Sequence, residues 1–388
     1  MRRLTMVYHD GGGGHRSAAN ALKDILATQE NPWEVDLLNL QELLDSIDVV
    51  HRLSGVRVQE VYNLILRKGW TRPTPQLLKV LQQTIRLYRR RIVKELRNYW
   101  AGHPADLVLS VIPHFNRPLA ESLQGATPQP PFVTLLTDLA DYPPHFWIER
   151  ESQYIIVGSE RAKQQALAMG HPASHTFQTS GMVLKPKFYQ QPRLDRVAER
   201  KRLGLRPDCP TGIVLFGGHG SGVMVDIVKR LDQIETEVQL IPLCGHNQKL
   251  ASELKALQTK KPLRVEGFTT NVEYFMALAD FFIGKPGPGS ISEALQFHLP
   301  VIVECNARTL PQERYNAEWV RENGFGIVLR SFRKIAPAVQ QLLDQSTLTE
   351  FRGRTEAYSN RALFEVPVIL EQCYRRHVRL PELALVPA

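Results

Sequence analysis

The sequence is poor in cysteine and lacks features that mark several common protein classes. Its 388 residues contain four cysteines, at 209, 244, 305 and 373, and no two of them form a CxxC pair. This scatter argues against a zinc site or a disulfide framework and favours a reducing, cytoplasmic setting. No run of about 18 apolar residues occurs, so we expect no membrane-spanning helix. The apolar run near the N-terminus is too short for a signal peptide.

Two nucleotide-binding patterns are missing as well. The turn Gly11–Gly14 is not followed by Gly-Lys-Ser/Thr, so it is not a P-loop. No Asp-x-Asp pair occurs in the chain. A divalent metal that bridges a nucleotide diphosphate therefore lacks its usual ligands, and we expect no metal site.

Positive charge is present in excess, and it lies in one segment. The formal net charge is +9, yet residues 51–100 contain 12 Lys and Arg against 2 Asp and Glu, and the rest of the chain contains 36 against 37. Leu77–Leu96 has the apolar spacing of a helix, crowded by Arg86, Arg89, Arg90 and Arg91. Basic residues beside an apolar face favour an anionic membrane surface. A solvated helix face is the common alternative. Nucleic acid ranks last, since the segment has few aromatic residues for base stacking.

The order of apolar runs predicts two α/β domains, as the length also favours. Strands alternating with helices indicate parallel, doubly wound sheets. Polar residues and prolines at Lys185–Asp195 read as a linker between two series of strands. The expected strands are Leu4–Tyr8, Glu34–Leu40, Asp106–Ile112, Pro131–Leu136 and Gln153–Val157 before the linker, and Gly212–Phe216, Gln239–Cys244, Leu263–Gly267, Phe281–Ile283 and Pro300–Glu304 after it. Two such domains facing each other form a cleft, the usual place for a ligand.

The stretch Phe281–Leu299 carries the strongest local pattern. A short buried strand runs into a Gly- and Pro-rich turn, and helical spacing resumes at Ile291. This geometry presents free backbone N–H groups at a helix start, where an anion such as a phosphate binds well. Ser290 and Glu293 have the spacing of a capping box. Glu293 could instead accept hydrogen bonds from the hydroxyls of a ribose.

The N-terminal glycine turn leaves two interpretations open. His15 follows the turn, and a histidine that points into the crevice at the strand ends can act as a general base. Asp138 and His145 would gather at the same edge. The alternative is that His15 caps its own helix. Asp36 lies about 20 residues beyond the turn, as a dinucleotide fingerprint expects, so a nicotinamide-dependent oxidoreductase stays open from this half alone.

Several motifs occur together in one order: HDGGGGHRSAANAL, TDLADYPPHFW, the glycine turn after GIVLF, GFTTNVEYFMALADFFIGKPGPGSISEAL and PQERYN. With them the chain resembles the monogalactosyldiacylglycerol synthase-type glycosyltransferases of GT-B fold. It is more distantly similar to the N-acetylglucosaminyltransferase of lipid II synthesis. The resemblance runs from about Leu4 to Asn316. It implies an inverting, metal-independent transfer of a hexose from a UDP-sugar to a lipid hydroxyl, with no cofactor. A UDP-sugar epimerase on a similar fold is a further alternative.

The resemblance also implies domains and residue roles. Residues 1–188 would bind the acceptor, 189–360 the donor, and 361–388 would cross back to the first domain. His15 would be the base, with Asp138 as its charge partner. His145, Trp147 and the basic segment 51–100 would face the acceptor and an anionic membrane, placing the enzyme in the cytoplasm on a membrane's inner face. No nucleic-acid partner is expected. The expected donor-binding residues are Gly14, Gly217, Gly218, Ser221, Phe268, Thr269, Gly287, Gly289, Ser290, Glu293, Gln312, Glu313 and Asn316.

One departure from the family concerns the third N-terminal strand. The family commonly has Ser-x-His-Pro there, whereas this chain reads Ser110-Val111-Ile112-Pro113 with His114 one step later.

Overall fold

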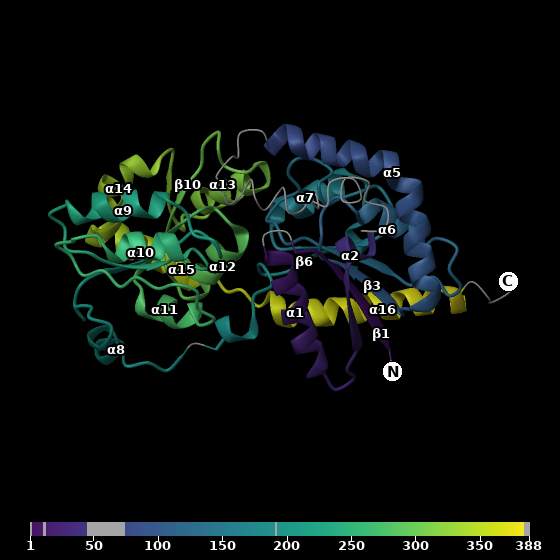
Figure 1. The fold of residues 1–388 in the computed structure, drawn as a ribbon. Coiled ribbons are helices and arrows are strands. Elements are labelled where there is room, and N and C mark those ends of the chain that lie inside the picture. The colour runs from purple at the N-terminus through teal and green to yellow at the C-terminus, as the bar shows by residue number, and fades with distance from the viewer. Residues whose placement is uncertain (1, 11–12, 45–73, 191, 384–388) are drawn as a thin grey trace. The chain divides into compact units, whose positions relative to one another are not determined.

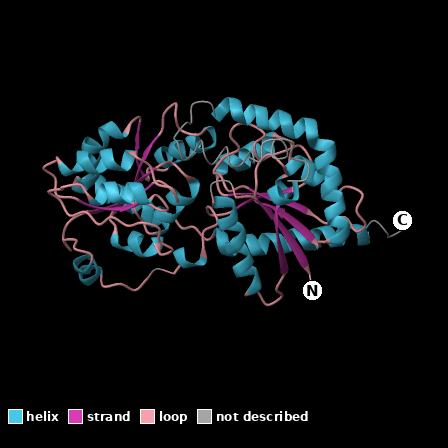
Figure 2. Ribbon diagram, in the orientation of Figure 1, coloured by secondary structure: helices cyan, strands magenta, loops and turns pink. Residues whose placement is uncertain are grey.

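The computed structural model describes residues 2–10, 13–44, 74–190 and 192–383. These residues form two compact units, Met1–Pro186 with Arg361–Ala388, and Lys187–Asn360. Each is an α/β unit with one parallel sheet and helices around it (Figures 1 and 2). The first part of the basic segment, residues 51–73, lies outside the described residues.

The first unit contains a six-stranded sheet in the order β2-β1-β3-β4-β5-β6. The central strands β3, β4 and β5 are wholly buried and rich in Val, Leu and Ile, as expected for a parallel sheet covered on both faces. The six strands are β1 (Arg3–Tyr8), β2 (Glu34–Asn39), β3 (Leu107–Ser110), β4 (Phe132–Leu135), β5 (Tyr154–Val157) and β6 (Thr176–Gln178).

The helices of this unit cover both faces of its sheet (Figure 1). α1 packs against α16, and α5 packs against α6. Their bounds are α1 (Gly14–Ala27), α2 (Leu40–Leu44), α5 (Thr74–Gly102), α6 (Asn116–Leu123), α7 (Glu160–Ala168), α16 (Ala362–Leu383) and the short turns η1 (Ala173–His175) and η2 (Pro186–Phe188). The C-terminal helix α16 therefore belongs to the unit in which the chain begins.

The second unit contains a five-stranded sheet in the order β11-β10-β9-β7-β8. A core of apolar side chains joins α9 and α14 to the sheet. The strands are β7 (Thr211–Leu215), β8 (Gln239–Leu243), β9 (Phe281–Gly284), β10 (Val301–Glu304) and β11 (Gly326–Leu329). The helical segments are α8 (Arg196–Arg202), α9 (Val223–Asp232), α10 (Gln248–Lys255), α11 (Val272–Leu278), α12 (Pro288–Gln296), η3 (Pro311–Glu313), α13 (Arg314–Glu322), η4 (Phe332–Lys334), α14 (Ile335–Leu343) and α15 (Gln345–Ala357).

The predicted doubly wound architecture is confirmed, with differences at the sheet edges. β6 and β11 are absent from the sequence prediction, and both are edge strands. β6 has three residues and β11 is only half buried, so neither shows the apolar run of a central strand. The predicted strand Leu263–Gly267 is wrong. That segment makes only isolated bridges, Leu240 with Leu263 and Leu243 with Glu266.

Candidate active site

Two glycine turns lie side by side in the second unit. β7 pairs directly with β9, and Leu215 is opposite Gly284 at the carboxyl ends of these strands. Each strand leads into a glycine-rich turn and then a helix, α9 or α12. The N–H groups of both helix starts therefore face the same edge of the sheet, which suits a doubly charged anion.

The first turn depends on glycine at one of its own positions and at one position in the turn after β8. Gly217 has a φ of 75°, a left-handed conformation that favours glycine. Gly245, in the turn after β8, approaches so closely that an added Cβ would lie 2.1 Å from the Gly218 carbonyl oxygen. The same oxygen accepts a hydrogen bond from the His246 N–H at 2.8 Å. Gly218 itself stays exposed, so the braced turn keeps an open outer side.

The second turn does not form the capping box that the sequence allows. α12 begins at Pro288 with Gly287 as its N-cap, so Ser290 lies inside the helix. The Ser290 hydroxyl donates back to the Gly287 carbonyl at 3.3 Å. Because Ser290 is not the N-cap, Glu293 has no capping box to close, and its half-buried carboxylate one turn further along suits a ligand role.

The residues expected to contact the sugar differ in exposure. Gln312 and Glu313 are each 8% exposed, and Asn316 is completely buried. The Asn316 amide donates to the Pro286 carbonyl at 2.9 Å. Asn316 therefore supports the second glycine turn from inside, and the direct sugar contact that the resemblance implies stays a prediction. Glu313 Oε1 lies 2.7 Å from Lys285 Nζ, at the same turn.

Phe268 is a large aromatic residue at the surface of the second unit. Its side chain is 61% exposed. It stacks on His246, with ring centroids 4.0 Å apart and planes 20° apart. The segment Phe268-Thr269, expected to read the base through its backbone, thus adjoins the turn that braces Gly218.

His15 lies at the start of α1, after Gly13 in a left-handed conformation with a φ of 80°. Its Nδ1 is 2.8 Å from the Val111 carbonyl oxygen and 2.9 Å from Thr137 Oγ1. A carbonyl can only accept, so Nδ1 carries the proton and Nε2 has a free electron pair. The backbone thus orients His15 in the way that a general base requires.

The structure places Asp138 beside the indole of Trp147. Its Oδ2 accepts a hydrogen bond from Trp147 Nε1 at 2.9 Å. Trp147 is completely buried, with its ring centroid 5.7 Å from that of His15, and its expected place at the acceptor stays a prediction. His145 is exposed, and its N–H donates to Asp141.

Two further histidines surround His15. The His9 and His15 rings lie 4.4 Å apart, His114 adds a charge interaction to His9, and His15 adds one to His114. Burial lowers the pKa of His15 to about 4, partly opposed by the Val111 hydrogen bond. Burial and His15 lower the pKa of His114 to about 4, and the pKa of His9 is also lowered, first by burial. All three imidazoles are therefore neutral near pH 7.

Sequence reasoning missed His9, His114 and Asp141. His114 has a φ of 68°, and its buried Nδ1 has no hydrogen-bond partner among the described residues. In the sequence, His114 stands just after the place where the family motif Ser-x-His-Pro has its histidine, and this shift was the available signal. Asp141 accepts hydrogen bonds from the His145 and Trp147 N–H groups and so shapes that loop. Burial raises the pKa of Asp141 to about 6. The second aspartate of TDLADYPPHFW is Asp141, and its place in this motif was the available signal.

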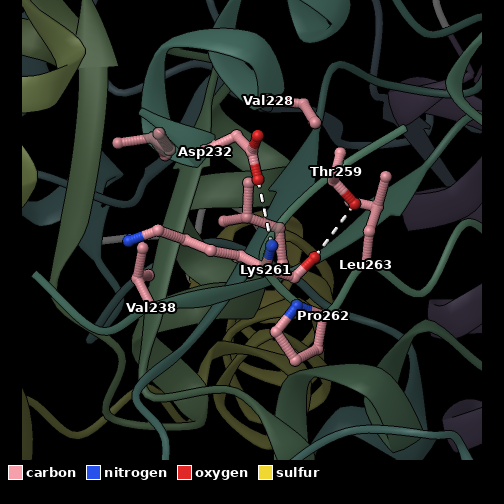
Figure 3. A pocket seen from close by; sticks show the side chains of 9 residues that line it. Val228, Asp232, Val238, Thr259, Lys261, Pro262 and Leu263 are labelled. Carbon is pink, nitrogen blue, oxygen red and sulfur yellow. Dashed lines mark hydrogen bonds between the residues drawn. The ribbon is translucent and has the colours of Figure 1, made fainter. Parts of the chain in front are cut away.

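A small hollow in the second unit is separate from these turns (Figure 3). It lies beside the end of α9, where Asp232 Oδ1 accepts hydrogen bonds from the backbone N–H groups of Lys260 and Lys261. The carboxylate is therefore satisfied by its own chain, as Figure 3 shows, and the hollow is a packing feature. Across the described residues, no three His, Cys, Asp or Glu side chains are grouped as metal ligands.

Helix α5 presents one basic face to solvent. Residues three or four apart share a face of a helix. The exposed cations at this spacing, with Arg91 beside them, are Arg86, Arg90, Arg91, Lys94 and Arg97. Leu87 lies among them and is 80% exposed. Arg89 is turned aside and pairs with Glu121 at 3.3 Å. No helix within the described residues is long and apolar enough to cross a membrane.

Comparison with known proteins gives the class of enzyme. Residues 212–371, which include both glycine turns, match the glycosyltransferase family 28 C-terminal domain. The chain is a glycosyltransferase. It is 29% identical over 350 residues to the probable monogalactosyldiacylglycerol synthase 3 of Oryza sativa subsp. japonica, covering 87% of this chain and 67% of the relative. It is 27% identical over 370 residues to the monogalactosyldiacylglycerol synthase of Spinacia oleracea, covering 88% and 66%. The glycosyltransferase thus spans about two thirds of the length of these relatives.

The fold comparison agrees. MurG of Acinetobacter baumannii superposes with a TM-score of 0.64 at 13% identity, covering 95% of this glycosyltransferase and 99% of MurG. The GT-B fold predicted from the motifs is therefore confirmed. The oxidoreductase alternative fails on the family match. It also fails locally, because Asp36 lies in the middle of β2 and Asn39 occupies the end of that strand.

Proposed function

We propose that this glycosyltransferase transfers a hexose from a UDP-sugar to a lipid hydroxyl of the diacylglycerol type, with inversion and without a metal or cofactor. The observation that carries the proposal is the adjacent pair of glycine turns at β7 and β9. They offer two helix starts to a diphosphate, and Glu293 lies one turn into α12, within the reach expected for a ribose. The names of the curated relatives supply the lipid acceptor.

The chemistry assigned to His15 follows from its hydrogen bonds. The acceptor hydroxyl gives its proton to His15 Nε2, and its oxygen forms a bond to the anomeric carbon. The bond from that carbon to the phosphate oxygen breaks, and UDP leaves with the electron pair. Attack opposite the leaving group inverts the anomeric centre. Backbone N–H groups at the glycine turns stabilise the leaving charge.

The basic face of α5 supports a peripheral place on an anionic membrane, on the cytoplasmic side. Five exposed cations surround the exposed Leu87. Cations close to anionic lipid contribute about 1 kcal/mol each, and an apolar side chain among them can enter the interface. Such a surface would bring the enzyme to a lipid acceptor.

A donor screen tests the proposal. Purified protein is incubated with a panel of UDP-sugars, with and without lipid extract, and released UDP is measured. We expect lipid-dependent release from one UDP-hexose, unchanged by EDTA, and a product of inverted anomeric configuration by NMR. Lipid-independent release, or a requirement for a divalent metal, would contradict the proposal.

A further inference from the structure

Lys285 lies between the two glycine turns. It follows β9 directly, and its side chain runs along both turns. A Cβ added at Gly217 would be 3.7 Å from Lys285 Cε, and one added at Gly287 would be 3.4 Å from the same atom. The end of the lysine side chain is thus in van der Waals reach of the first and the second turn at once.

The ammonium group of Lys285 is held in place by one carboxylate. Glu313 Oε1 lies 2.7 Å from Nζ. The Glu313 side chain is 11% exposed and that of Lys285 is 39% exposed, so the anion sits on the inner side and the cation on the open side. An ammonium has three N–H donors, and Glu313 takes one of them. Among the described residues no partner takes the other two, which suits a ligand at the turns.

The backbone around this pair is also fixed. Glu313 lies in η3, immediately before α13, and Asn316 of α13 holds the Pro286 carbonyl beside Lys285. Three other cations of the unit are occupied or lie elsewhere on its helices. The Arg314 guanidinium donates to the carbonyls of Thr309 and Ala307. Lys229 and Arg230 lie in the last turn of α9. The first glycine turn lies at the other end of this helix, before Val223.

We propose that Lys285 binds the diphosphate of the donor and stabilises its charge as the bond to the sugar breaks, an assignment that rests on the proposed UDP-sugar donor. When that bond breaks, its electron pair stays on the phosphate oxygen, and the added negative charge falls on the diphosphate. Lys285 keeps its proton and acts through charge and hydrogen bonds. A fixed cation placed where charge develops stabilises the transition state more than the ground state.

Calorimetric titration with UDP and with uridine tests this assignment. We expect Lys285→Met to weaken UDP binding about 10- to 100-fold, the range for a lost charged hydrogen bond, and to leave uridine binding unchanged. The kcat with the active UDP-sugar should fall by about 10²-fold or more. Lys285→Arg, which keeps the charge, should retain most UDP affinity. Lys229→Met is the matched control, an exposed lysine of the same unit far along α9.

The outcomes separate this assignment from the proposed function. Wild-type protein that binds no UDP would overturn the donor and the assignment together. If the wild-type protein binds UDP and Lys285→Met binds it equally tightly, the assignment is wrong and the proposed donor stands. Glu313→Gln gives a second contrast, because loss of the anion that positions Lys285 should weaken UDP binding and leave uridine binding unchanged. If Glu313→Gln and Lys285→Met weaken UDP and uridine alike, the pair only holds the turn, and the assignment is wrong.

Discussion

The candidate sites in the two units suit ligands of different charge, an anion in the second unit and a neutral hydroxyl in the first. In the second unit the site consists of open backbone, with two helix starts and a cation beside them, all suited to an anion. In the first unit it consists of three clustered histidines whose pKa values are lowered by burial, His15 and His114 to about 4. A neutral imidazole with a free Nε2 suits a neutral hydroxyl that must lose a proton. The comparison shows why the proposed function assigns the charge of the diphosphate to the second unit and proton transfer to the first.

The largest expected effect breaks the first unit's side of this comparison. His15→Ala should lower kcat about 10²–10⁴-fold, the range of general-base catalysis, because no oriented Nε2 remains. UDP affinity should stay nearly the same, since all the expected donor residues except Gly14 belong to the second unit. Steady-state kinetics and calorimetry measure the two effects. His103→Ala, an exposed histidine at the end of α5, is the control. Full turnover in His15→Ala would show that His15 is structural.

The basic face of α5 gives the next effect. Replacing Arg86, Arg90 and Arg91 with Glu should remove about 3 kcal/mol or more of attraction to anionic lipid, since each cation contributes about 1 kcal/mol. Sedimentation with anionic liposomes should be lost while UDP binding remains. Arg89 is left out because it pairs with Glu121.

The matched control for that triple variant carries the same change in charge. It replaces the exposed Arg330, Arg333 and Lys334 of the second unit with Glu. Its sedimentation should match that of the wild type. Equal loss in both variants would mean that net charge alone governs binding, and binding that ignores lipid charge would refute docking by α5.

Glu293→Gln sharpens the comparison from the second unit. The variant keeps the shape of the side chain and removes a charged acceptor, so UDP binding should weaken by about 1.5–3 kcal/mol. The melting temperature without ligand should change little, because the substitution keeps the size and shape of the side chain. Calorimetry and a thermal melt provide both values. Unchanged UDP affinity, or binding of NADH instead, would contradict the ribose assignment.

The smallest effect is the response of the histidines to acid. Their folded pKa values lie below the unfolded value of about 6.5, so the folded state binds fewer protons. Their contribution to stability is complete above pH 6.5 and is lost as the pH falls toward 4. His15→Gln should flatten this slope in denaturant titrations. The acidic limb of kcat/KM should also lie near pH 4, and a limb near 6.5 would show that His15 titrates as an exposed imidazole.

Much of the fold follows from the sequence because buried parallel strands are continuous apolar runs. β3, β4, β8 and β10 lie within the predicted ranges. The edge strands β6 and β11 could not be found in this way, because partial burial removes the apolar run.

Less of the candidate site was predictable. Motifs marked His15 and the two glycine turns, since glycine and histidine at those positions have few other uses. They could not show that Val111 orients His15 through a backbone carbonyl, because every residue has one. The motifs could not show which of their side chains are buried either. Trp147 and Asn316 read as contacts in the motif and lie in the interior of the protein.

The buried Asn316 has a consequence for attempts to alter which sugar is transferred. Its amide ties α13 to the second glycine turn, so a substitution there would disturb phosphate binding for every donor alike. Gln312 lies on η3, directly before the same helix, and is 8% exposed, whereas Asn316 is completely buried. A library of variants meant to change sugar choice should therefore vary Gln312 and keep Asn316 constant.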